Sequence, residues 1–297
     1  MNLDFLMVFL FPDICFVFCC TLALYLIIMK ISKVFIQDYK VFKDFILMKR
    51  FLKLILFAFV LLFISSCRST EQILKEALAS KNKVTELRLG RKGLTEIPKE
   101  VFELTNLEEL ILYKNNITEI PPEIGKLKKL KRLALSRNKI KKIAPEIGNL
   151  TNLENLTLYF NEIDSLPEEI GNLKNLDELN LAYNNLTKLP ASLGNLNSLE
   201  ILYLGHNHLT EIPKELGKCD RLVILNIGKN DLKALPRELG DIVTLNELNL
   251  SHSGVMLDIP ESLCNLRNLQ ILTIDNTAIL PYCLQGSVNP RLHIIVQ

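Results

Sequence analysis

The sequence lacks the short motifs by which many enzymes and cofactor-binding proteins are identified. It contains no Cys-x-x-Cys pair of the kind that binds zinc, no glycine-rich fingerprint for nucleotide phosphates and no Gly-x-Ser-x-Gly turn for a nucleophilic serine. The histidines do not converge either, because His206 and His208 flank a single residue and His252 lies two repeats further along the chain. We therefore predict no catalytic residue, no metal site and no cofactor.

The sequence also lacks a large net charge. Its formal charge is +2, and residues 1–67 contribute +3 from seven Lys/Arg and four Asp, so the remaining 28 basic and 29 acidic residues sum to −1. A nearly neutral domain offers no electrostatic footprint for a nucleic acid. We therefore expect no nucleic-acid partner.

Cysteine is too sparse for a disulfide framework. Three of the seven cysteines lie before residue 21, and Cys219 stands where other repeats have leucine, which indicates a small buried hydrophobic side chain. Cys264 and Cys283 both lie near the C-terminal end. We predict free buried thiols for these two, and a disulfide between them is the alternative.

What the sequence does contain is a repeat of 23 residues. The series begins at Val84 and ends with a copy at Leu269 that follows one inserted residue. The copies between them begin at Leu107, Leu130, Leu153, Leu176, Leu199, Leu222 and Leu245. Self-similarity of this period is typical of a solenoid, in which neighbouring units bury the apolar face that one unit cannot bury alone.

Each unit predicts one short strand followed by a turn. In the unit that begins at Leu153, Leu156 and Leu158 alternate with Thr157 and therefore point to the same side of a strand. The ninth position is asparagine in six units, and an inward amide there can satisfy backbone groups where the chain leaves the strand. This column consists of Asn115, Asn138, Asn161, Asn184, Asn207 and Asn230.

The string Leu-x-x-Leu-x-Leu-x-x-Asn-x-Leu resembles the leucine-rich repeat family over about residues 84 to 280. The resemblance implies an α/β solenoid with a curved parallel sheet on its concave face and short 3₁₀ or helical turns on its convex face. The return path fits a tight turn that Pro167 starts and Gly171 stops. We expect nine repeat units over residues 84–291.

The N-terminal end of the array needs a cap. Ser69 and Gln72 have capping-box spacing. The apolar residues that follow fall on one helical face, and they are Ile73, Leu74, Ala77 and Leu78. We predict a short helix over residues 69–81, within a cap region at residues 67–83.

The C-terminal end needs a cap as well. Leu292 lies 23 residues after Leu269, so the period continues into the last residues of the sequence. We therefore predict that residues 292–297 form a truncated strand that closes the array.

Residues 48–66 have the features of a signal peptide. A basic start precedes an apolar run from Leu54 to Ile64. The small residues before Cys67 resemble the lipobox of bacterial lipoproteins, which implies that Cys67 receives the lipid and becomes the new N-terminus. The alternative is an uncut membrane anchor over residues 51–66.

Residues 1–47 are either an over-extended start or an extra apolar segment. The apolar run from Ile14 to Met29 is 16 residues long, slightly short for a membrane span. We favour the over-extended start, because Met48 is an ordinary start residue at the head of a complete signal peptide. Whether residues 1–47 are translated is left open.

The outward positions of the repeats are free for recognition. Most aromatic residues of the repeats collect there in neighbouring units, and exposed aromatic clusters anchor interfaces. The predicted protein-binding residues of the concave face are Tyr113, Tyr159, Phe160, Tyr183, Tyr203, His206, Arg88 and Arg137. The alternative is that these rings pack on one another merely to cover the sheet.

Together, the lipobox, cap helix and 23-residue units are similar to those of lipidated leucine-rich repeat proteins of spirochaetes such as Leptospira. The resemblance implies a lipid-anchored, non-enzymatic protein of the bacterial outer membrane or cell surface. We expect a monomer that binds a host or envelope protein, and the sequence does not identify this partner. The alternatives are a periplasm-facing or an intracellular scaffold and, less favoured, a secreted effector.

Overall fold

The computed structural model describes residues 69–254, 257–285 and 291–297. The predicted apolar start, the signal peptide and the lipidated Cys67 lie outside the described residues. Within the described part of the chain, no helix is both long enough and apolar enough to cross a membrane.

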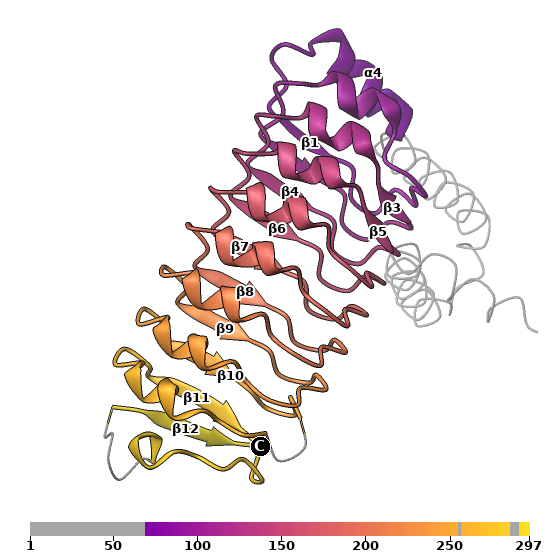
Figure 1. Ribbon diagram of the computed structural model, residues 1–297. Helices are drawn as coiled ribbons and strands as arrows, with labels where there is room; N and C mark the ends of the chain where they lie inside the picture. The colour runs from indigo at the N-terminus through magenta and orange to yellow at the C-terminus, as the bar shows by residue number, and fades with distance from the viewer. Residues whose placement is uncertain (1–68, 255–256, 286–290) are drawn as a thin grey trace, which may run out of the picture. The chain divides into compact units, whose positions relative to one another are not determined.

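Ten short strands form one parallel sheet whose order follows the chain (Figure 1). The strands are β1 (Glu86–Arg88), β2 (Glu109–Ile111), β4 (Arg132–Ala134), β6 (Asn155–Thr157), β7 (Glu178–Asn180), β8 (Ile201–Tyr203), β9 (Ile224–Asn226), β10 (Glu247–Asn249), β11 (Ile271–Ile274) and β12 (His293–Val296). Leu156 pairs with Leu179, 23 positions further on, and this offset holds from β1 to β10. The structure confirms the predicted solenoid.

Short 3₁₀ turns line the side of the stack opposite the sheet (Figure 1). They are η2 (Lys99–Glu103), η3 (Pro122–Lys126), η4 (Pro145–Asn149), η5 (Glu168–Asn172), η6 (Ala191–Asn195), η7 (Lys214–Lys218), η8 (Arg237–Asp241), η9 (Glu261–Asn265) and η10 (Tyr282–Leu284). Two further strands, β3 (Glu119–Ile120) and β5 (Lys142–Ile143), pair with each other beside the main sheet.

The glycine of the return path has a different role from the one predicted. Gly171 lies inside η5 and does not end it, since the turn continues to Asn172. A Cβ atom on Gly171 would overlap the carbonyl oxygen of Ser192 in the next turn, and one on Gly194 would overlap that of Glu215. The glycine column therefore lets neighbouring turns approach closely.

The core consists of the leucines that alternate along the strands. Leu156 and Leu158 have no exposed surface, and each such burial contributes about 1.5–3 kcal/mol. The asparagine column lies beside them: Asn184 Nδ2 donates to the carbonyls of Leu158 (3.0 Å) and Leu181 (2.9 Å), while its Oδ1 accepts from the Ile163 N–H (3.1 Å). The predicted structural role of this column is confirmed.

At the N-terminal end lies α4 (Thr70–Ala79), at the position predicted for a cap helix (Figure 1). Ser69 is its N-cap, and the Ser69 and Gln72 side chains make the reciprocal hydrogen bonds of a capping box. Leu74 and Ala77 are buried in the same cluster as the first repeats. The helix therefore covers apolar surface that no preceding repeat covers.

The C-terminal end differs from the prediction in two respects. β12 pairs with β11 at an offset of 22 residues, Ile271 with His293, and not at the 23 expected from Leu292. Cys264 and Cys283 form a disulfide with Cα atoms 5.7 Å apart, so the prediction of two free thiols was wrong. The successive turns η9 and η10 bring these two cysteines together.

Cys219 is free and fully buried, as predicted. Burial raises the pKa of its thiol to about 11, with a smaller contribution from Asp220. The protonated thiol therefore prevails at neutral pH, and Cys219 acts as a small core side chain.

Candidate functional site

Residues that alternate with the core leucines form the other side of the main sheet, which we call the sheet face. In three adjacent strands, Thr157, Asn180 and Tyr203 are paired in register and are each partly exposed. The sheet face continues past the strand ends into the turn that leads to each asparagine of the inner column. The predicted binding residues divide between the strands and these turns.

Four of the predicted residues, Tyr159, Phe160, Tyr183 and His206, form one continuous group, which we call the aromatic cluster. The rings of Tyr183 and His206 are stacked with centroids 3.7 Å apart, and Phe160 stacks on Tyr183 at 5.3 Å. Tyr159 meets Tyr183 edge-on at 5.2 Å and Phe160 at 5.6 Å. Phe160 is 51% exposed and Tyr183 is 37% exposed, so the cluster is only partly covered.

The backbone sets the direction of these rings. Phe160, Tyr183 and His206 are the eighth residues of successive units, and all three have a positive φ, between 57° and 61°. A left-handed residue at the end of a strand turns the chain and directs its side chain away from the following inward asparagine. Because neighbouring units lie about 4.8 Å apart, the rings come into stacking distance.

Arg137 and Tyr113 lie toward the N-terminal units. The guanidinium of Arg137 lies 6.0 Å from the Phe160 ring centroid, which extends the cluster by one cation. Tyr113 belongs to a separate contact, in which Arg91 lies 5.5 Å from its ring centroid. The structure therefore brings Arg137 to the cluster but not Tyr113.

The last two predicted residues lie within strands. Tyr203 in β8 is partly buried, and burial raises the pKa of its phenol, with smaller contributions from Glu178 and Glu247. Arg88 in β1 is exposed and forms an ion pair with Glu86, whose hydrogen bond raises the pKa of the Arg88 guanidinium. Tyr203 thus lies beside the aromatic cluster, whereas Arg88 lies three strands from β6.

His206 carries a neutral ring more readily than a free histidine does. Burial lowers its pKa, and the neighbouring Lys229 lowers it further. A neutral imidazole suits the face-to-face contact with Tyr183. The sequence reasoning missed Lys229, although it occupies the same eighth position as His206 in the next unit.

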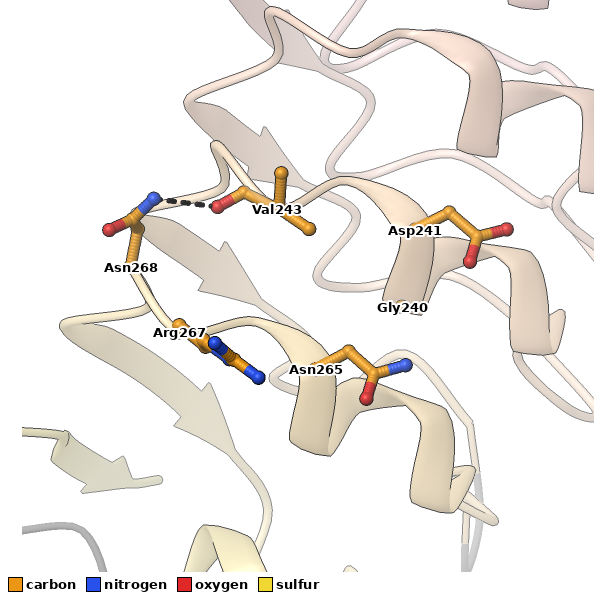
Figure 2. Close-up of a pocket in the computed structure, with 6 residues that line it drawn as sticks. All are labelled: Gly240, Asp241, Val243, Asn265, Arg267 and Asn268. Atoms are coloured by element: carbon orange, nitrogen blue, oxygen red, sulfur yellow. Dashed lines mark hydrogen bonds between the residues drawn. The ribbon is translucent and has the colours of Figure 1, made fainter.

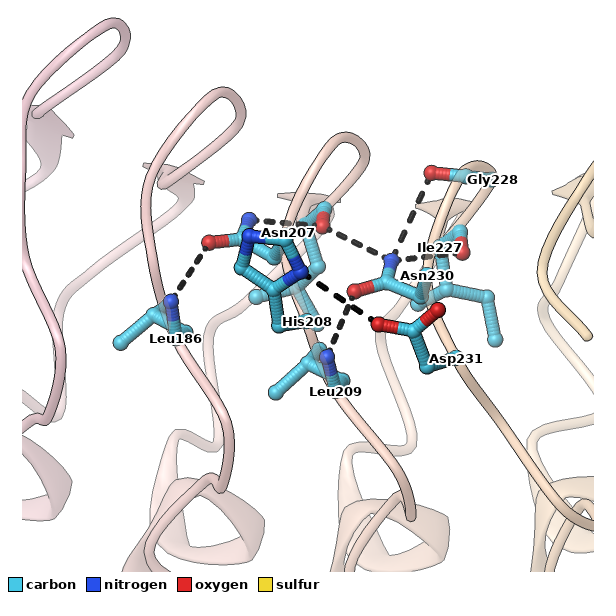
Figure 3. A network of polar contacts seen from close by, with 9 residues as sticks. Leu186, Asn207, His208, Leu209, Ile227, Gly228, Asn230 and Asp231 are labelled. Carbon is cyan, nitrogen blue, oxygen red and sulfur yellow. Dashed lines mark hydrogen bonds and ion pairs between the residues drawn. The ribbon is translucent and has the colours of Figure 1, made fainter.

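A polar network lies just inside the strand ends (Figure 3). Asn207 Oδ1 accepts from the Leu186 N–H at 3.0 Å, and Asn230 Oδ1 accepts from the Leu209 N–H at 3.0 Å. Beside them, His208 Nδ1 lies 3.4 Å from Asp231 Oδ2. This pair is exposed and contains two ligand types at most, and among the described residues no group of three or more His, Cys, Asp or Glu could hold a metal ion.

A polar depression lies between η8 and η9 (Figure 2). Its lining is Gly240, Asp241, Val243, Asn265, Arg267 and Asn268. Asn268 Nδ2 donates to the Val243 carbonyl at 2.8 Å and joins the two units beneath it. Because it is an open gap between two turns, it offers neither an enclosed apolar wall nor convergent polar groups for a small molecule.

Comparison with known families gives the same description. A leucine-rich repeat region model matches residues 47–181, and two further leucine-rich repeat models match residues 175–196 and 198–255. This chain is a leucine-rich repeat protein. Its sheet face is therefore the face that is concave in such solenoids. No curated protein matches the sequence.

Solved structures include several similar leucine-rich repeat proteins. A protein of Leptospira interrogans is 33% identical, with a TM-score of 0.66, over 75% of this chain and 58% of its own. The ectodomain of the Arabidopsis thaliana receptor kinase GASSHO1/SCHENGEN3, in complex with CASPARIAN STRIP INTEGRITY FACTOR 2, is 30% identical, with a TM-score of 0.62, over 72% of this chain and 30% of its own. Internalin C2 of Listeria monocytogenes is 27% identical, with a TM-score of 0.59, over 66% of this chain and 83% of its own.

The present chain thus spans less than two thirds of the Leptospira protein and less than a third of the plant ectodomain. The similarity covers the repeats, which commonly act as scaffolds for protein ligands and are generally not catalytic. It does not extend to the activities of the longer proteins.

Proposed function

We propose that the protein is an exported, lipid-anchored and non-enzymatic leucine-rich repeat protein of the bacterial cell envelope, which binds another protein through its sheet face. The observation that carries the proposal is the aromatic cluster of Tyr159, Phe160, Tyr183 and His206. A partly exposed, contiguous group of rings held by rigid repeats is the type of surface that anchors a protein interface. Arg137 and Tyr203 border the cluster and complete the proposed site.

The relatives support a protein ligand. The plant ectodomain was solved with a bound factor, and the present chain is similar to it over its repeats. For this chain we propose a partner of the host surface or of the envelope and a monomeric binding form.

The disulfide supports export. Disulfides persist in oxidising compartments and are rare in the cytosol of most bacteria. The Cys264–Cys283 bond therefore favours an envelope protein over the intracellular scaffold that was the alternative. It fits the proposed signal peptide at residues 48–66 and lipidation at Cys67.

The test of binding uses chemical cross-linking: the proteins that become cross-linked to the wild-type chain are compared with those that become cross-linked to its variants. We expect Tyr159→Ala combined with Tyr183→Ala to abolish partner capture, because the centre of the cluster is removed. Tyr282→Ala is the matched control, since this tyrosine is 75% exposed but lies in η10. Equal capture by the double variant would refute the binding site, and a collapsed fold by circular dichroism would show that the tyrosines are structural.

The test of anchoring uses metabolic labelling with a palmitate analogue. We expect label on the wild-type chain and none on Cys67→Ala, and label on both would contradict lipidation at this residue. Protease treatment of intact cells then separates the two orientations of the anchor. Loss of the chain supports surface exposure, whereas full protection supports the periplasm-facing alternative.

A further inference from the structure

The eighth residues of the first eight units form one line along the ends of strands β1 to β10, which we call the strand-end row. All of them have a positive φ, between 54° and 59° except for Phe160 at 61°. The row consists of Arg91, Lys114, Arg137, Phe160, Tyr183, His206, Lys229 and His252. Every member is a cation, an aromatic residue or a histidine, and none is acidic.

The backbone makes this composition unexpected. A left-handed backbone favours glycine, asparagine, aspartate and histidine, and it disfavours other large side chains. Only His206 and His252 belong to this favoured group, and the other six members of the row are Lys, Arg, Phe or Tyr. Gly93 shows that the chain does use a left-handed glycine nearby. The large side chains are therefore not explained by the turn itself.

Two cations of the row, Lys114 and Arg137, are available to a ligand. Lys114 and Arg137 are exposed, lie in adjacent units, and make no ion pair with a carboxylate among the described residues. By contrast, the two basic residues at and just before the start of β4, in the same unit as Arg137, both form ion pairs with glutamates of the preceding unit. Lys131 Nζ lies 2.8 Å from Glu108, and Arg132 lies 3.6 Å from Glu109.

The opposite border of the sheet face, where the strands begin, carries carboxylates in the three units that begin at Leu153, Leu176 and Leu199. Glu154, Asp177 and Glu200 occupy the second position of three successive units, and Glu178 lies next to Asp177. Burial raises the pKa of Asp177, and Glu200 and Glu154 raise it further, so these carboxylates lie close enough to repel one another. In these units the strand starts are negative, although Arg221 lies 2.9 Å from Glu200 and offsets part of that charge, whereas the strand-end row contains no acidic residue.

We propose that the strand-end row binds an acidic polypeptide segment of the partner, laid along the stack with its carboxylates at Lys114 and Arg137 and its apolar side chains on the aromatic cluster. The inference rests on the proposed function and adds the chemistry of the ligand. Such a segment places negative charge at two cations that pair with no carboxylate among the described residues. It also leaves the acidic border free for basic residues of the same partner.

A polypeptide fits these contacts better than another polyanion does. Nucleic acids and sugars bind to open ring faces, but the faces of Tyr183 and His206 cover each other at 3.7 Å. A broad anionic surface, such as a membrane, would also meet the carboxylates at the strand starts. A narrow chain with both acidic and apolar side chains avoids both conflicts.

The experiment measures fluorescence anisotropy of a labelled synthetic peptide of glutamate, leucine and glycine with the full-length chain in detergent micelles. A peptide with lysine in place of glutamate and a heparin oligosaccharide are the comparison probes. We expect the acidic peptide to bind, and its affinity to fall with added salt. Lys114→Glu combined with Arg137→Glu should weaken it at least about tenfold.

The matched control is Lys126→Glu combined with Lys128→Glu, which makes the same charge change at and just after η3. This control should keep the affinity for the acidic peptide within about twofold. Three results would each overturn the inference: no binding of the acidic peptide, equal weakening by both double variants, or tighter row-dependent binding of heparin. If the cross-linked partner is still lost in Tyr159→Ala with Tyr183→Ala, the proposed function stands even when this inference fails.

Discussion

Tyr183 and Asn184 are neighbours in the chain, yet they belong to regions with opposite roles. Asn184 is 5% exposed and belongs to the inner asparagine column, where its amide bonds four backbone groups of two adjacent units. Tyr183 is 37% exposed and belongs to the strand-end row. In this pair the left-handed residue faces outward for recognition, and the asparagine that follows it faces inward for stability. The same arrangement recurs in Phe160 and Asn161.

The comparison teaches that the outer row can vary in chemistry without a large cost to the fold. The inner column needs an inward polar side chain, because the backbone groups that its asparagines bond are buried and have no water to replace the lost bonds. The strand-end row faces outward, so its residues can differ in chemistry to suit a ligand. The predictions below challenge this separation, beginning with the largest effect.

The largest effect is expected in the leucine core, which supports both regions. Leu179 in β7 has no exposed surface, so Leu179→Ala should lower the free energy of unfolding by about 2–5 kcal/mol. Chemical denaturation measures this change. Because each repeat contacts its neighbours, a cost below about 1 kcal/mol would mean that the stack does not depend on this unit.

The next effect is expected in the inner column. Asn184→Ala leaves the buried Ile163 N–H without its acceptor. The carbonyls of Leu158 and Leu181 lose one donor each but keep a second, from the amides of Asn161 and Asn207. We expect a loss of about 1–3 kcal/mol in the free energy of unfolding. Asn185→Ala is the matched control, since Asn185 is exposed, and it should change stability by less than about 0.5 kcal/mol. Similar melting of the two variants would remove the distinction between column and surface.

The smallest effect is a dependence on pH within the row. The folded-state pKa of His206 is lowered from its ordinary value of 6.5, so the unfolded chain takes up a proton first as the pH falls. The contribution of the neutral His206 ring to the free energy of unfolding is fully present above pH 6.5. It is lost as the pH falls from 6.5 through the lowered pKa of the folded state. Thermal melting of His206→Gln should show less acid sensitivity than the wild type, and a larger sensitivity would reverse the assigned sign.

Much of the fold follows from the sequence because the repeat is regular. A fixed period sets both the register of the strands and the side to which Leu156 and Leu158 point. The asparagine column follows from the same logic, since any strand that ends in a buried turn needs partners for its backbone. The repeat begins to vary near Leu269, and there the prediction of the β12 register failed by one residue.

The disulfide and the row could not be derived in the same way. Cys264 and Cys283 are 19 residues apart, and their approach depends on how η9 and η10 follow each other beyond the regular units. The stacking of Tyr183 and His206 depends on the left-handed turn, which the string of residue types does not reveal. An alignment of the repeat units at their eighth position would nevertheless have identified Lys229 as a further residue of the strand-end row.

The most direct measurement of the separation is made on Tyr183→Ala and Asn184→Ala side by side, with melting and capture of the cross-linked partner recorded for each. We predict that Tyr183→Ala loses capture while its stability falls by about 1 kcal/mol or less, the value of part of its ring contacts. Asn184→Ala should melt earlier, yet capture the partner normally at a temperature where it is folded. The reverse pattern, with normal capture by Tyr183→Ala and lost capture by folded Asn184→Ala, would contradict the account.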